Sequence, residues 1–232
     1  MLFLKCEKIF GIPIAVGTRA DIIAMAHSLV GMGGVVCTPN AEIMDAARRD
    51  EEYGRLLREA TLNVPDGISV VRAMRRRGFY TEKVSGVELG ETLLSHGHTF
   101  AVIGGKEGVA LRAGLALSGR YPKSRLLFSR SGYGYRVSDI KKQLARYTPD
   151  IVLVCLGASR QEFLIDEIRC ASPNSLYLAL GGAVDVYAGD KSRAPAAFIQ
   201  LGLEWLWRIM KEPVRIKKIP SILRFAVLSK KG

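Results

Sequence analysis

The chain has 232 residues, of which 48% are hydrophobic and 24% charged; it can form one sizeable core, and this composition excludes wholesale disorder. Its four cysteines form no C-x-x-C pair, so we expect a reduced, cytoplasmic protein without a metal cluster. We expect neither a signal peptide nor a membrane span, because charges interrupt the N-terminal apolar residues and no stretch reaches about 18 uncharged apolar residues.

The first half of the chain alternates short apolar runs with helix-like segments. Thr18 and Asp21 predict a capped helix start, Pro39 ends a strand, and Asn40 can cap the helix that follows. Gly54 is expected to divide that second helix. The segments are strands at 12–16, 34–39 and 61–64, and helices at 18–34, 41–60 and 67–77.

The second half repeats this alternation more regularly. Residues 150–157, DIVLVCLG, form a continuous apolar run of the kind found in central parallel strands. Ser138 is the expected cap of one helix. The segments are strands at 98–105, 125–130, 150–157 and 175–182, and helices at 106–121, 138–147 and 159–170. The alternation predicts an α/β, Rossmann-like fold, with a largely parallel sheet flanked by helices.

The C-terminal segment differs from this body. The formal net charge is +12, and residues 205–232 carry +7 of it, since they hold eight Lys or Arg and one acid, Glu212. We therefore divide the chain into an α/β catalytic domain, 1–198, and a basic amphipathic C-terminal appendage, 199–232. The charge indicates an anionic partner: a membrane, nucleic acid or a phosphorylated substrate.

Within the appendage, a helix-like run is stopped by Pro213, and residues 221–231 follow Pro220. Their apolar side chains fall at helical spacing with a cationic border, which suits a helix at a membrane surface; a helix packed on the core is the alternative. The apolar face comprises Ile219, Ile222, Leu223, Ala226 and Val227.

Ligands of parallel α/β sheets bind beyond the carboxyl ends of the strands, so we list the polar and glycine residues that follow each strand. They are Thr38, Asn40, Asp66, Gly104, Gly105, Lys106, Gly157, Ser159, Arg160, Gln161, Glu162, Gly181, Gly182 and Asp185. The strand–glycine–helix junction IGGKEG can cradle a phosphate, although the same glycines suit ordinary packing. Glu162 in a first helical turn also fits compensation of the helix dipole.

Three further features remain open at this level. Residues 181–195, GGAVDVYAGDKSRAP, lack periodicity, which is typical of a functional loop. Tyr133 within RSGYGY can stack on a base or lie in a surface turn. The NVPDG stretch around Asp66 taken alone favours an ordinary turn, and a carboxylate held for chemistry is the alternative.

Taken together, the segments resemble the WecG/TagA/CpsF family of bacterial glycosyltransferases from about Gly11 to Lys218. The matching stretches are TPNAEIM, VPDGISVV, KVSGVEL, FAVIGGKEGVA, GYGY, PDIVLVCLGASRQEF, GGAVDVYAGDKSRAP and LGLEWLWRIMKEPVRIKK. The family usually has Pro-Lys where this chain has Ser159-Arg160, and Lys83 and Lys218 stand where arginine is frequent.

The resemblance implies an inverting transfer of an N-acetylmannosamine-type sugar from a UDP donor to a polyprenyl-diphosphate-linked sugar, without a required metal or other cofactor. It implies a peripheral protein on the inner, anionic face of the cell membrane, self-associating as a dimer or trimer, which makes cell-surface polysaccharide.

The resemblance also assigns roles to residues. It implies that Asp66 is the catalytic base, with Thr38 and Asn40 holding the sugar nearby. The implied substrate-binding residues are Lys83, Gly104, Gly105, Tyr133, Gly157, Gln161, Glu162, Asp185, Arg193, Arg208, Arg215 and Lys218. The basic residues of the tail would neutralise the departing diphosphate.

Two other classes of protein fit less well. A non-catalytic nucleotide- or nucleic-acid-binding protein would explain the positive charge, but the basic tail is too apolar and contains no recognised binding module, so we expect no nucleic-acid partner. A nicotinamide-dependent oxidoreductase would need the G-x-G-x-x-G fingerprint, which IGGKEG does not match.

Overall fold

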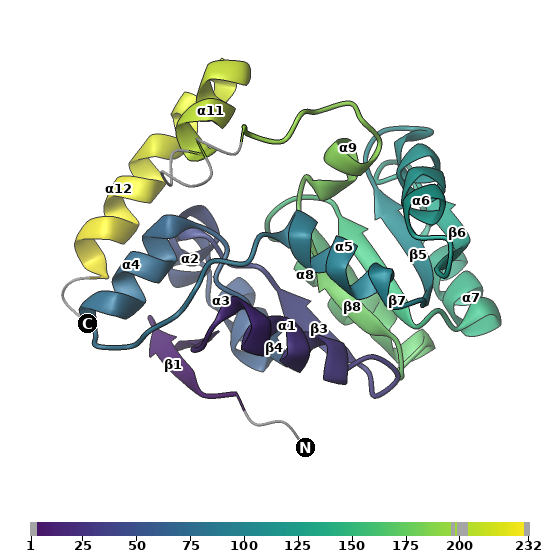
Figure 1. Cartoon of the computed structure of the whole chain (residues 1–232), viewed down its shortest axis with the longest axis horizontal. Helices are drawn as coiled ribbons and strands as arrows, with labels where there is room; N and C mark the ends of the chain where they lie inside the picture. The colour runs from purple at the N-terminus through teal and green to yellow at the C-terminus, as the bar shows by residue number, and fades with distance from the viewer. Residues whose placement is uncertain (1–3, 196–197, 199–203, 230–232) are drawn as a thin grey trace.

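The computed structural model describes residues 4–195, 198 and 204–229, with only the backbone of Trp205, Arg208, Val214 and Arg215. Six parallel strands form one sheet in the order β4-β3-β8-β7-β5-β6 (Figure 1). The strands are β3 (Gly34–Cys37), β4 (Leu62–Asn63), β5 (Thr99–Gly104), β6 (Arg125–Arg130), β7 (Ile151–Cys155) and β8 (Leu176–Ala179). The predicted parallel α/β sheet is confirmed.

Helices cover both faces of this sheet, because its central strands are apolar on both sides. In β7, Ile151 and Leu153 face one core cluster, and Val152 and Val154 face the other. The first cluster is closed by α1 (Arg19–Ser28), α5 (Gly86–Ser95), α6 (Val109–Arg120) and α9 (Ala183–Tyr187). The second is closed by α2 (Ala41–Arg49), α3 (Glu51–Glu59), α4 (Ile68–Arg76), α7 (Val137–Tyr147), α8 (Arg160–Ile168) and α12 (Ile219–Leu228). A short 3₁₀ segment, η1 (Arg169–Ala171), follows α8.

The strand expected at 12–16 forms, but outside the main sheet. It is β2 (Ile12–Ala15), which pairs antiparallel with β1 (Cys6–Ile9) in a hairpin. The sequence did not predict β1, because charged Glu7 and Lys8 interrupt its apolar residues. The hairpin places Ile9, Ile12 and Ile14 in the second core cluster.

The long helix expected at 41–60 is divided at Asp50 and not at Gly54. Asp50 has an extended backbone, and its carboxylate accepts a hydrogen bond from the Tyr53 N–H at 3.0 Å, which caps α3. Gly54 lies inside α3, where a Cβ atom would come within 2.8 Å of the Ala47 carbonyl oxygen. The glycine therefore allows α2 and α3 to approach closely, and the aspartate makes the break.

Other helix starts also differ from the prediction. Thr18 and Asp21 form the expected capping box of α1. Ser138 does not cap α7, because that helix begins at Val137 and has no side-chain cap. Helix α5 was not predicted; its Gly86 and Gly90 lower helix propensity but let it pack against Leu180 and Tyr187.

All three histidines meet at the amino-terminal edge of the sheet, far along the chain from one another. The His27 ring lies 4.4 Å from the His96 ring, and its Nε2 lies 3.3 Å from that of His98. Burial and the neighbouring imidazoles lower the pKa of His27. The two histidines that flank Gly97 therefore form a small cluster with His27 of α1.

The C-terminal segment comprises α11 (Glu204–Lys211), a 3₁₀ segment η2 (Pro213–Lys218) and α12. As expected, α11 ends just before Pro213. Helix α12 packs on the core, the alternative given above, but through Phe225, which is not one of the predicted apolar-face residues and packs edge-to-face on Phe10 at 5.9 Å between ring centroids. Leu223 and Val227 are instead exposed, by 60% and 55%.

Helix α12 is also fixed by charge. Asp45 of α2 has a fully buried side chain, and its carboxylate accepts hydrogen bonds from Arg224 Nη2 at 2.9 Å and Nε at 3.1 Å. Burial opposes ionisation of Asp45, but Arg224 and Arg49 outweigh it and hold the pKa of the carboxyl below its ordinary value. In Figure 1, α12 accordingly lies beside α2 and α4.

Among the helices that the structure describes, none combines the length and hydrophobicity needed to cross a membrane.

Substitution of Phe225 tests how firmly α12 is packed on the body. Phe225→Ala should lower the free energy of unfolding by about 3 kcal/mol, since it removes a fully buried aromatic side chain. The exposed Leu223→Ala on the same helix should change it by less than about 0.5 kcal/mol. Denaturant titration measures both, and equal effects would contradict the observed orientation of the helix.

Candidate active site

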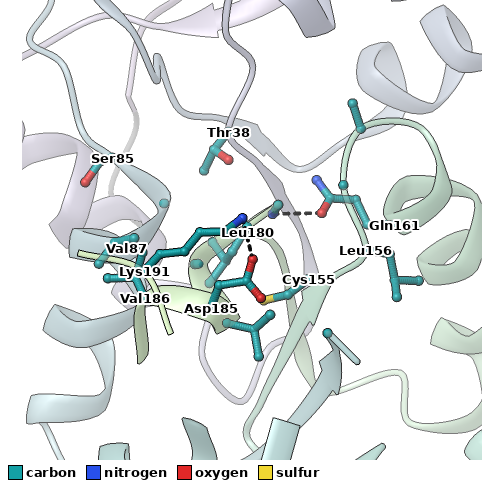
Figure 2. Close-up of a pocket in the computed structure, with 18 of the residues that line it drawn as sticks. Thr38, Ser85, Val87, Cys155, Leu156, Gln161, Leu180, Asp185, Val186 and Lys191 are labelled. Atoms are coloured by element: carbon teal, nitrogen blue, oxygen red, sulfur yellow. Dashed lines mark hydrogen bonds and ion pairs between the residues drawn. The ribbon is translucent and has the colours of Figure 1, made fainter. Parts of the chain in front are cut away.

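A cavity of about 880 Å³ opens at the carboxyl edge of the sheet, where all six strand-to-helix connections meet. Figure 2 shows Thr38, Gln161 and Asp185 reaching it from three different elements. One connection after each strand contributes to the lining: Thr38 and Asn40 after β3, Asp66 after β4, Gly105 after β5, Tyr133 after β6, Gly157 and Gln161 after β7, and Asp185 after β8. The predicted convergence of these residues on one edge is confirmed.

Asp66 lies at this edge because its loop is fastened to its neighbours. The Asp66 N–H donates to the Pro39 carbonyl at 3.1 Å, and the Val84 N–H donates to the Pro65 carbonyl at 3.1 Å. Gly67 follows with φ of 121°, a backbone conformation that favours glycine, and then α4 begins. The turn and the carboxylate are therefore one feature: the turn positions a half-buried Asp66 in the cavity wall.

Thr38 and Asn40 each serve the fold as well as the cavity. The Thr38 hydroxyl donates to the Ala179 carbonyl at 2.9 Å, which ties the ends of β3 and β8 together. The Asn40 amide oxygen accepts from the N–H groups of Glu42 and Ile43 at 3.0 and 3.1 Å and caps α2. The cap engages only the oxygen, so the amide NH₂ group is the side chain's hydrogen-bond donor.

Gln161 lines the cavity from the first turn of α8. Its amide oxygen accepts from the Gly181 N–H at 2.8 Å, drawn as a dashed line in Figure 2, and its amide nitrogen donates to Glu162 at 2.9 Å. Glu162 itself is buried behind Gln161 and does not line the cavity. Gly104 is also set back, with its Cα so close to Cys155 that a Cβ would lie 2.3 Å from that carbonyl oxygen.

Tyr133 is exposed at one wall of the cavity and is held by Arg160, one of the residues that follow β7. The Arg160 guanidinium lies 5.4 Å from the centre of the Tyr133 ring and donates to the Gly132 carbonyl at 3.1 Å. Arg160 thus joins the loops after β6 and β7. Ser159, just before it, has φ of 64°, which proline cannot adopt, so this loop differs from a Pro-Lys loop.

Several cationic side chains around the cavity contact a carboxylate. Lys191 lies 2.8 Å from Asp185 and 3.2 Å from Glu212, and Lys218 lies 2.8 Å from Glu42. Arg193 lies 3.9 Å from Glu88, and Lys83 pairs with Glu204 without itself lining the cavity. Lys191 was not predicted to be a binding residue. It does lie within residues 181–195, the stretch whose lack of periodicity is typical of a functional loop.

The family of the chain is shown by comparison with known proteins. The model described as "Glycosyl transferase WecG/TagA/CpsF family" matches residues 7–231. The chain belongs to this family. A Bacillus subtilis (strain 168) relative, named N-acetylglucosaminyldiphosphoundecaprenol N-acetyl-beta-D-mannosaminyltransferase, is 32% identical over 201 residues, which cover 84% of this chain and 78% of the relative. The predicted family and the glycosyltransferase class are confirmed.

In this glycosyltransferase, the side chains of Arg208 and Arg215 lie outside the described residues, so their predicted contact with the diphosphate stays a prediction. Within the described part of the chain, no group of three His, Cys, Asp or Glu side chains is arranged to hold a metal ion. Cys155 lines the cavity, but burial raises its pKa to about 12 and keeps the thiol protonated.

The two functions of Asn40 can be separated by substitution. Asn40→Ala should lower the free energy of unfolding by about 1 kcal/mol, because two N–H groups of α2 lose their acceptor. Asn40→Asp keeps an acceptor at the helix start and should stay within about 0.5 kcal/mol of the wild type. Urea denaturation of the three proteins measures this, and equal stability of both variants would argue against the cap.

Proposed function

We propose that this glycosyltransferase moves an N-acetylmannosamine-type sugar from a UDP donor to the sugar of a polyprenyl-diphosphate-linked acceptor. The product belongs to a cell-surface polysaccharide pathway of the teichoic acid, enterobacterial common antigen or capsule type. Family membership and the name of the Bacillus subtilis relative support this substrate class. The observation that carries the proposal is the presence of Asp66 in the wall of the cavity to which the loops after all six strands contribute.

Asp66 acts as the general base in this proposal. Its carboxylate removes the proton of the acceptor hydroxyl while the hydroxyl oxygen attacks the anomeric carbon of the donor sugar. The bond from that carbon to the diphosphate oxygen breaks, and UDP departs with the electron pair. A single displacement of this kind inverts the anomeric centre. In this proposal the NH₂ group of Asn40 and the hydroxyl of Thr38, two residues that line the same cavity as Asp66, hold the sugar.

The departing diphosphate needs compensation of its charge. We assign this role to cations of the protein and expect no required metal. Lys218 lines the cavity and lies in η2, and Lys191 faces it from the loop after α9. Both lysines are paired with carboxylates of the protein. The diphosphate would replace these carboxylates as the partner of each lysine. Arg208 and Arg215 belong to the same basic segment, and we assign them the same role of compensating the charge of the diphosphate.

The acceptor is a lipid, which requires a position at the membrane surface. We propose that the C-terminal segment, residues 204–229, makes this contact at the inner face of the cell membrane. This segment contains exposed apolar side chains together with lysines. Such a combination favours binding to an anionic membrane surface. The exposed apolar side chains are Met210, Ile216, Leu223 and Val227.

Asp66→Asn tests the catalytic assignment, because it preserves shape and removes the base. Transfer from UDP-N-acetylmannosamine to a lipid-diphosphate-N-acetylglucosamine acceptor should fall by about 100-fold or more, the usual contribution of a general base. Binding of the UDP-sugar, measured by calorimetry, should stay within about twofold of the wild type.

The control is Asp139→Asn, a carboxylate of α7 that does not line this cavity. It should leave transfer unchanged. Full activity of Asp66→Asn would remove Asp66 as the base, and absence of transfer by the wild type with any UDP-sugar would contradict the donor class.

The membrane contact is tested with the double variant Leu223→Glu/Val227→Glu. Its partition onto vesicles containing anionic lipid should fall by more than about tenfold, because two side chains that would insert become charged. The matched control is Leu111→Glu/Leu115→Glu on α6, where the exposed leucines face solvent elsewhere. Equal loss in both variants, or in neither, would contradict the assignment of α12 to the interface.

A further inference from the structure

Glu162 is a buried carboxyl group directly behind the wall of the cavity. Its side chain is 3% exposed and lies in the first turn of α8, next in sequence to Gln161, which does line the cavity. The sequence placed Glu162 among the residues that touch the substrate. Its position behind Gln161 indicates that it acts through that neighbour.

The contacts of Gln161 explain how this occurs. Glu162 Oε1 accepts from the Gln161 amide nitrogen at 2.9 Å, and the Gln161 amide oxygen accepts from the Gly181 N–H at 2.8 Å. An amide can rotate by 180° with little change in shape, so its orientation is set by its partners. Glu162 and Gly181 together fix the orientation of the Gln161 amide group. The second N–H of the Gln161 amide nitrogen is then available to donate to an oxygen atom of a ligand in the cavity.

The surroundings of Glu162 disfavour a negative charge. Tyr53 of α3 and Cys37 of β3 face it, and both are buried. Among the described residues, Glu162 Oε2 and the Tyr53 hydroxyl make no hydrogen bond of acceptable geometry, and no cationic side chain pairs with Glu162. Burial raises the pKa of Glu162 to about 7, although hydrogen bonds from Gln161 and from backbone N–H groups act in the opposite direction, so the group changes its charge near neutral pH.

We propose that Glu162 is a positioning residue for donor binding: its Oε1 accepts from the Gln161 amide and holds that amide toward the donor, and its ionisation behind the cavity wall places a negative charge there that weakens binding of the negatively charged sugar nucleotide. The proposal rests on the UDP-sugar donor proposed above. It adds a dependence of donor affinity on pH that is separate from the base Asp66.

The test measures the dissociation constant of UDP-N-acetylmannosamine by calorimetry between pH 6 and 8.5, without acceptor. The diphosphate of a sugar nucleotide keeps a constant charge in this range, so a change in affinity reports on the protein. For the wild type, the dissociation constant should rise by up to about tenfold between pH 6 and 8, as expected for a group with a pKa near 7. In Glu162→Gln, which stays neutral and still offers an acceptor, it should change by less than about twofold.

Two further variants separate positioning from general damage. Glu162→Leu removes the acceptor and should weaken binding by about tenfold at every pH, the cost of a lost buried hydrogen bond. Glu167→Gln removes an exposed carboxylate from the same helix and should retain the wild-type profile. A wild-type profile in Glu162→Gln would overturn the proposal.

A stability measurement gives a readout independent of binding. The folded protein holds the Glu162 proton more tightly than the unfolded chain, so this group's contribution to stability declines as pH rises from about 4.5 through 7. Glu162→Gln lacks this decline and should gain in unfolding temperature relative to the wild type at pH 8 but not at pH 5. An equal difference in unfolding temperature at both pH values would contradict the titration of Glu162 as a buried carboxyl group.

The outcomes also distinguish this proposal from the proposed function. Donor binding and transfer with an affinity independent of pH would overturn the role of Glu162 and leave the glycosyltransferase assignment intact. Absence of UDP-sugar binding by the wild type at any pH would overturn both.

Discussion

All six strands of the main sheet run in the same direction, and the position of every proposed active-site group depends on this. Parallel strands deliver each following loop to one edge, so residues from Thr38 to Asp185 meet at a single cavity although the chain separates them widely. The sheet can be parallel because helices shield both of its apolar faces. The two core clusters therefore determine the site as much as the polar residues do.

Several side chains at this edge both fasten a loop and face the cavity. Asn40 caps α2, Thr38 joins two strands, and Gln161 joins α8 to the loop after β8. A side chain held by its backbone partners loses little entropy on binding a ligand, which is a common route to a pre-organised site. Because each of these side chains both fastens a loop and faces the cavity, a substitution here affects folding and binding together. Isosteric variants are needed to separate the two effects.

The C-terminal segment is held by two kinds of contact. The pairs Lys83–Glu204, Lys191–Glu212 and Lys218–Glu42 are partly exposed, and such pairs each contribute only about 0–1 kcal/mol. Phe225 and the buried carboxylate of Asp45 fix α12 more firmly. A diphosphate that competes for Lys191 or Lys218 would therefore exchange weak pairs and leave the anchored helix in place.

The main strands and the edge that carries Asp66 could be predicted from the sequence, because continuous apolar runs such as IVLVC and the following glycines are local signals. Helix α5 could not be predicted from the sequence. Its two glycines lower helix propensity, and the reason for them, close packing against Leu180 and Tyr187, is seen only in the folded structure. Burial of Glu162 behind Gln161 depends on α3 and β3, which are distant in sequence. Pairing of the basic residues likewise follows from tertiary contacts, whereas composition revealed only their charge.

The anomeric configuration of the product is the most direct test of a single displacement assisted by Asp66. NMR spectroscopy of the sugar bond formed from a UDP-sugar of known configuration measures it. A single displacement gives a configuration opposite to that of the donor, because one attack from the face opposite the diphosphate completes the reaction. Retention of the donor configuration would require a different mechanism and would contradict the role of Asp66 as the base.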